Sequence, residues 1–64
     1  MMTAEECVAA IRAFGYEAEV DEAGLPTFLL TEKQYKKGWR RYERMIRSLG
    51  WNRSWAMKEM KKKC

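Results

Sequence analysis

One short pattern occurs twice in this chain and constrains its architecture more than any other feature. Residues 11–16, Ile-Arg-Ala-Phe-Gly-Tyr, return as residues 46–51, Ile-Arg-Ser-Leu-Gly-Trp. A helical pattern precedes the glycine in each copy, and an alternating pattern follows. Glycine directly after the last apolar residue of a helix adopts the left-handed conformation that ends the helix without a Cβ clash. The repeat therefore predicts two helix–glycine–strand units.

The length of the chain, 64 residues, allows one small domain with a dense core. A chain of this size buries only about 60% of the surface that it exposes when unfolded. Three Trp, three Tyr and two Phe supply the large side chains that such a core needs. Neither a membrane span nor a signal-peptide pattern is evident. We expect one cytoplasmic domain over residues 1–60, no membrane partner, and a frayed basic tail over residues 61–64.

The first helix is predicted from a capping box, in which Thr3 and Glu6 each bond to the other's backbone amide. It runs to about Phe14 and should turn Cys7, Ile11 and Phe14 toward the core. We therefore interpret this cysteine as a core residue rather than a nucleophile. It and Cys64 have neither disulfide-framework nor metal-ligand spacing, and both are expected to be reduced thiols.

A β-hairpin is predicted next. Residues 16–20 alternate, with apolar side chains on one face and two glutamates on the other, as in a half-buried strand. Residues 21–24, Asp-Glu-Ala-Gly, have the composition of a turn, and residues 26–30 form a second strand that begins with proline.

A second capping box, Thr31 to Gln34, starts the most clearly predicted helix of the chain. Its apolar stripe lies within about an 80° arc at the helical period and consists of Tyr35, Trp39, Tyr42, Ile46 and Leu49. Gly38 lies inside this helix at a cost of up to about 1 kcal/mol relative to alanine. It either allows close packing beside Trp39 or is simply tolerated.

Residues 51–57 alternate again and predict a third strand, although a short helix capped by Ser54 is an alternative. The expected order is helix, strand, strand, helix, strand. A right-handed crossover makes strand three parallel in direction to strand two. If it docks beside strand one, the result is an α+β two-layer sandwich with an antiparallel sheet in the order 3-1-2 and both helices on one face.

Enzyme chemistry is not indicated by the sequence. The chain has no histidine and no evident pair of buried carboxylates for acid–base catalysis. Phosphate-binding loops, zinc-ligand spacings and serine nucleophile elbows are absent from the sequence as well. We expect no catalytic residues, no cofactor, no metal and no small-molecule substrate.

Charge is distributed very unevenly along the chain and provides the best indication of function. Residues 1–30 carry one basic and six acidic side chains, whereas residues 31–64 carry twelve basic and three acidic ones. A uniformly basic helix face that points away from the sheet fits a nucleic-acid backbone. The candidate contact residues are Lys33, Lys36, Lys37, Arg40, Arg41, Arg44, Arg47 and Arg53. The unremarkable alternative is a solvated helix face.

Two other questions stay open on the sequence. Trp51 and Trp55 either stack bases on an open sheet face beside Arg53 or belong to the core, and the core is favoured because so small a domain needs them. The second candidate function is a protein-interaction or homodimer module that associates through the acidic hairpin, a sheet edge or the open face around Leu29.

The segment Gly-Trp-Asn-Arg-Ser-Trp at residues 50–55, together with Gly-Leu-Pro at residues 24–26, resembles short proteins of bacterial mobile elements. The resemblance covers most of the chain and implies a bacterial accessory-gene origin. That family has no assigned activity, so the resemblance implies no site residue. The helix and tail of this chain are unusually basic for it.

Overall fold

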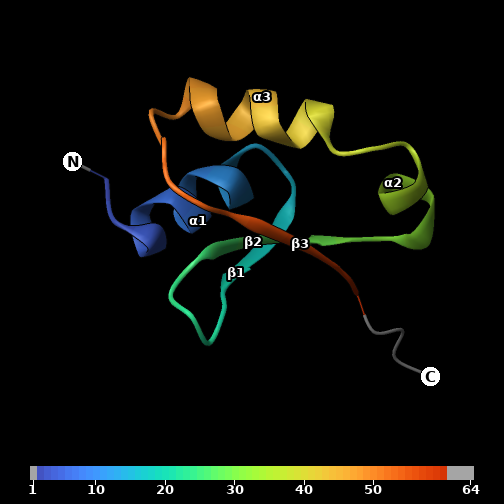
Figure 1. Cartoon of the computed structure of the whole chain (residues 1–64), viewed down its shortest axis with the longest axis horizontal. Helices are drawn as coiled ribbons and strands as arrows, with labels where there is room; N and C mark the ends of the chain where they lie inside the picture. Colours follow the sequence, from blue (N-terminus) through green and yellow to red (C-terminus); the bar gives the residue numbers. More distant parts are fainter. Residues whose placement is uncertain (1, 61–64) are drawn as a thin grey trace.

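The computed structural model describes residues 2–60, which form an α+β structure with the helices α1 and α3 on the same side of an open sheet (Figure 1). The elements are α1 (Ala4–Ala13), β1 (Glu17–Val20), β2 (Pro26–Leu30), α2 (Glu32–Lys36), α3 (Arg40–Ser48) and β3 (Ala56–Glu59). The predicted fold class is confirmed. The basic tail and Cys64 lie outside the described residues.

Both predicted capping boxes are present. The Thr3 hydroxyl accepts from the Glu6 amide at 3.1 Å, and the Glu6 carboxylate accepts from the Thr3 amide at 2.8 Å. Thr31 and Gln34 repeat the arrangement at 3.2 and 2.9 Å. Gly15 and Gly50, the glycines of the sequence repeat, have φ values of +96° and +84° and follow α1 and α3 as predicted.

The predicted hairpin is also confirmed. β1 and β2 pair antiparallel, with Ala18 opposite Phe28. In the turn the Asp21 carboxylate accepts hydrogen bonds from the amides of Ala23 and Leu25 at 2.9 and 2.8 Å. This acidic side chain therefore has a structural role in the turn.

The predicted order of the sheet is wrong. Within residues 2–60 the order is β1-β2-β3, and β3 runs parallel to β2, so the sheet is mixed rather than an antiparallel 3-1-2 sheet. The third strand runs parallel to the second, as predicted, but it pairs with the second strand and not with the first. The reason is packing: Trp55 meets Phe28 of β2 edge-on at 5.5 Å between ring centroids, and Met57 pairs with the same phenylalanine. The strand begins at Ala56, so residues 51–55 form a loop before it.

The predicted single second helix is divided into α2 and α3. Gly38 lies between them with φ +103°, a conformation that interrupts a right-handed helix. Only the later part of the apolar stripe is buried, at Tyr42 and Ile46. Tyr35 and Trp39 are exposed, contrary to prediction. Tyr35 lies before the interruption, on α2, and Trp39 lies directly after it, at the cap position where α3 begins.

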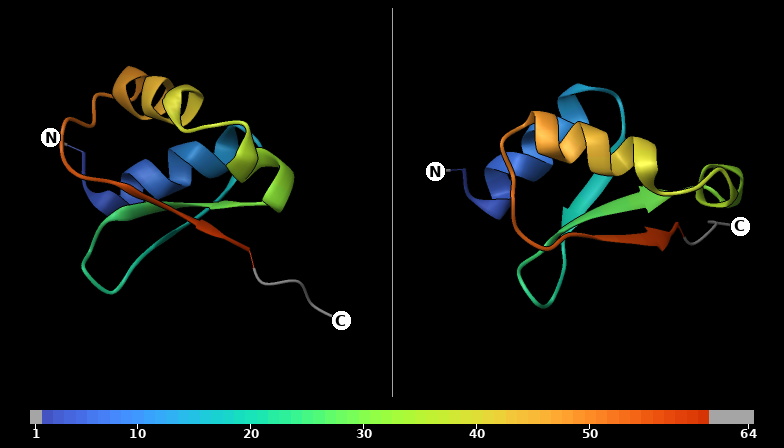
Figure 2. Two further views of the ribbon diagram at one scale, coloured as in Figure 1. Left: turned by 45° about the vertical axis from the view of Figure 1, so that its right-hand side comes forward. Right: turned by 45° about the horizontal axis from the view of Figure 1, so that its top comes forward.

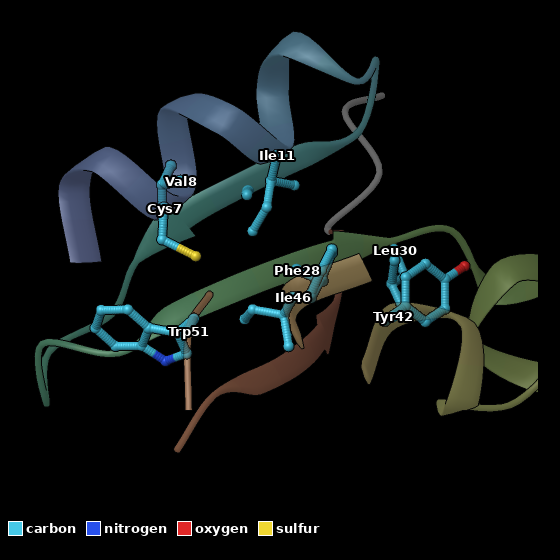
Figure 3. Packing of buried hydrophobic residues seen from close by; sticks show 9 residues of the cluster. Cys7, Val8, Ile11, Phe28, Leu30, Tyr42, Ile46 and Trp51 are labelled. Carbon is cyan, nitrogen blue, oxygen red and sulfur yellow. The ribbon is translucent and has the colours of Figure 1, made fainter. Parts of the chain in front are cut away.

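The core lies between the helices and the sheet (Figure 3). Its buried members are Cys7, Val8, Ile11, Ala18, Phe28, Leu30, Tyr42, Ile46 and Trp51. Cys7 and Ile11 are buried as predicted, whereas Phe14 is 59% exposed. Phe14 caps the C-terminus of α1, and its predicted core position is wrong because the chain turns away there.

The opposite face of the sheet carries polar side chains. Glu19 of β1 and Lys58 of β3 reach across β2 and pair at 2.7 Å, and this carboxylate raises the pKa of Lys58. Leu29, expected to be exposed on this face, is half-buried. The molecule measures 38 × 22 × 21 Å, and β2 runs from the acidic hairpin tip at one end to α2 at the other (Figure 2).

Candidate nucleic-acid interface

The structure divides the eight predicted basic residues into three groups. Lys33 and Lys36 lie on α2. Lys37, Arg40, Arg41 and Arg44 gather where α2 meets α3. Arg47 and Arg53 lie at the other end of α3 and in the loop that follows. The continuous basic face expected of a single helix is therefore replaced by separate clusters.

The middle group lines a hollow of about 440 Å³, which we call the junction hollow. Its lining consists of Lys37, Gly38, Trp39, Arg40, Arg41 and Arg44. Among the described residues, no carboxylate lines this hollow. Four cationic side chains thus surround one concave surface without an acidic neighbour in its wall.

The outer groups differ because acidic side chains accompany them. Lys36 pairs with Glu32 at 3.2 Å, and Arg47 pairs with Glu43 at 3.5 Å, both at i,i+4 spacing. Both pairs are largely solvent-exposed, and such pairs stabilise a protein by at most about 1 kcal/mol. Their main effect is to reduce the positive charge on either side of the junction hollow.

The start of α3 has the reverse of the usual charge arrangement. Helix N-termini carry partial positive charge and are stabilised by acidic side chains and caps. α1 follows the rule with Glu5 and Glu6, whereas α3 begins with Arg40 and Arg41 and carries Glu43 as the acidic residue of its first turn. Trp39 occupies the cap position, where its indole, a donor only, cannot accept a hydrogen bond from the helix amides. The partial positive charge of the backbone amides and the charges of the two arginines therefore add together at the N-terminus of α3.

Trp39 is the functional candidate that sequence reasoning missed. It is 48% exposed, and the guanidinium carbon of Arg40 lies 5.8 Å from its ring centroid, a cation–π arrangement. The helical period assigned it to the core. The signal that could have revealed its exposure is Gly38, directly before it.

The other tryptophans are not available on the open sheet face. Trp51 is 6% exposed, and its indole N–H donates to the Ser54 carbonyl at 3.1 Å. Trp55 is half-buried against Phe28. Arg53 lies over the Trp51 ring at 5.9 Å. The core alternative for these two tryptophans is supported, and Arg53 is separated from the junction hollow.

Other kinds of site find little support in residues 2–60. They contain no group of three or more His, Cys, Asp or Glu side chains placed to hold a metal ion. Burial raises the pKa of the Cys7 thiol, so a smaller fraction of it is the reactive thiolate at neutral pH. None of the helices in this part of the chain has the length and apolar character needed to cross a bilayer.

No protein-family model, curated protein or solved structure matches the chain. The resemblance to short proteins of bacterial mobile elements therefore stays a prediction.

Proposed function

We propose that this protein is a non-catalytic nucleic-acid-binding module of the cytoplasm and that the junction hollow is its main contact surface. The observation that carries the proposal is the meeting of four cationic side chains around one hollow at the positive end of α3. Clusters of arginine and lysine bind phosphate through charge-assisted hydrogen bonds. A nucleic-acid backbone presents such phosphates in series.

The cost of this arrangement to the free protein supports the proposal over a merely solvated helix face. Arg40 and Arg44 lie four residues apart on α3, where like charges repel, and cations at a helix N-terminus oppose its dipole. A bound polyanion would remove both unfavourable effects. Lys36 and Arg47 differ in that each is paired with a glutamate at i,i+4.

Neutralisation within the molecule is disfavoured by its shape. The acidic hairpin tip with Asp21 and Glu22 lies at the far end of β2 from the junction of α2 and α3 (Figure 2). The hairpin tip of the same molecule is therefore not placed to neutralise the junction hollow, and a polyanion bound there would come from another molecule. The hairpin of a second copy is the competing source, which makes the homodimer the alternative that a test must separate.

The test is reversal of charge at three positions, Arg40→Glu, Arg41→Glu and Arg44→Glu, in one variant. We expect the affinity for labelled DNA and RNA oligonucleotides at low salt, measured by fluorescence anisotropy, to fall roughly 100-fold because three phosphate contacts are lost. For the unaltered protein, neutralising about four phosphates predicts a slope in log affinity against log salt of about −2.8 on single strands and about −3.6 on duplex DNA.

The matched control is the variant Lys33→Glu, Lys36→Glu, Arg47→Glu, which changes the net charge equally outside the hollow. It should retain most of the affinity. Equal losses in both variants would show that the attraction is not localised in the hollow. Absence of binding by the unaltered protein at low salt would contradict the proposal, and a concentration-dependent dimer in gel filtration would then favour the homodimer.

A further inference from the structure

We infer that the junction hollow takes single-stranded rather than duplex nucleic acid, with a base stacked on the indole of Trp39. This inference rests on the proposed function and specifies its ligand. It starts from a large aromatic side chain that is nearly half exposed in the wall of a cationic hollow. Sequence-tolerant binding of single strands uses these two parts together, a basic groove and an aromatic ring on which a base stacks.

The ring of Trp39 lies next to a cation. The Arg40 guanidinium lies 5.8 Å from its ring centroid and brings positive charge next to the indole. Nearly half of the surface of Trp39 is exposed, and this is the surface that a base would contact. A base stacked there would place its phosphates near the cations of the hollow, Lys37 and Arg41 among them.

The local backbone argues against a duplex. Bases in a duplex are stacked on one another, and their faces are hidden from a protein side chain. Recognition helices that read the major groove present their contact residues along one helix face. Here Gly38 interrupts the basic helix, with α2 spanning five residues and α3 nine, and the cations converge on a hollow instead of following one long face.

The experiment compares Trp39→Ala and Trp39→Phe with the unaltered protein on single-stranded and duplex oligonucleotides of equal length, in DNA and RNA forms. Trp39→Ala should lose about 10-fold in affinity for single strands, as loss of one base–aromatic contact does. Affinity for duplexes should change less than about 2-fold. Trp39→Phe should keep most of the single-strand affinity because a ring remains.

Two controls make the result specific. Phe14→Ala removes another exposed aromatic side chain, one that does not line the hollow, and should leave both affinities unchanged. An oligonucleotide of abasic residues keeps the phosphates but offers no base, so it should bind the unaltered protein and Trp39→Ala equally. Because Trp39 is exposed, its removal should leave the urea unfolding midpoint close to that of the unaltered protein.

The outcomes separate this inference from the proposed function. A higher affinity for duplex than for single strands, or an equal loss of affinity for both forms in Trp39→Ala, would overturn the stacking inference. The proposed function would still be supported if binding depended on the arginines of the hollow. Binding to neither form at low salt would overturn both. A larger loss on RNA than on DNA, or the reverse, would identify the polymer that stacks on Trp39.

Discussion

Tyr42 combines complete burial with a hydroxyl that finds no hydrogen-bond partner within residues 2–60. Its ring contacts Phe28 at 5.1 Å and Tyr16 at 6.1 Å between centroids, so the aromatic part is well packed. Figure 3 shows it beside Leu30 at one end of the core. A buried hydroxyl without a partner costs about 1–3 kcal/mol. The ring of this residue stabilises the fold, and its unpaired hydroxyl lowers that stability.

Tyr42→Phe should therefore raise the free energy of unfolding by about 1 kcal/mol at neutral pH, because it keeps the ring and removes the hydroxyl. Urea unfolding followed by tryptophan fluorescence measures the change. A decrease of 1 kcal/mol or more would show that the hydroxyl is hydrogen-bonded in solution.

The same variant has a defined pH dependence. Burial raises the pKa of Tyr42 above its ordinary value of 10.0, Arg41 opposes this shift, and Tyr16 adds to it. The unfolded phenol loses its proton first, so the stability linked to this group is complete below pH 10.0 and falls as pH rises further. The advantage of Tyr42→Phe should grow above that pH. The Cys7 thiol, whose pKa burial also raises, contributes equally in both proteins.

At the scale of elements, the starts of α1 and α2, the ends of α1 and α3, and the hairpin were predictable because each depends on a few neighbouring residues. Thr3 and Thr31 start helices through contacts three residues away, and Asp21 closes its turn through contacts within four residues. The division of the second helix was not predicted, because one glycine costs only about 1 kcal/mol inside a helix and so does not by itself indicate an interruption. The apolar stripe continues across Gly38, so its period alone favours an uninterrupted helix.

Gly38→Ala tests the role of this interruption. Its φ of +103° is unfavourable for alanine, and no atom lies within 4 Å of the position of the added Cβ, so the cost is conformational. We expect a loss of stability of about 1–2 kcal/mol in urea unfolding. We also expect weaker binding of single-stranded oligonucleotides, because the altered backbone would move Trp39 and Lys37 relative to the arginines of the hollow.

Gly24→Ala is the matched control, since Gly24 has φ +81° and open space around its Cβ position but lies in the hairpin turn. It should lose similar stability and keep its affinity for oligonucleotides. Equal losses of affinity in the two variants would mean that general destabilisation, and not the geometry of the junction, weakens binding.

At the scale of the whole molecule, the sheet order depends on contacts between distant residues. Alternation shows which side chains share a face but not which edge a strand joins. The contact of Trp55 with Phe28 places β3 beside β2, and no local pattern contains that pairing.

The candidate site was likewise predictable only in part: its residues follow from the sequence, and their arrangement in space does not. Its cations were predictable as residues, because their charge and spacing are visible in the sequence. Their grouping around one hollow, and the exposure of Trp39 in its wall, depend on the direction that the chain takes after Gly38. The uneven distribution of charge along the sequence is also a separation in space, because the acidic hairpin tip and the basic junction of α2 and α3 lie at opposite ends of the molecule (Figure 2).

The most direct measurement is the change in amide and indole chemical shifts of the labelled protein on addition of a single-stranded oligonucleotide at low and moderate salt. We expect shifts concentrated in residues 37–44 and at the Trp39 indole N–H, and we expect them to become smaller as salt increases. The indole signal of Trp51, hydrogen-bonded to Ser54 in the core, should remain in place. Unchanged spectra at low salt with DNA and RNA alike, or shifts confined to the hairpin and the open sheet face, would contradict it.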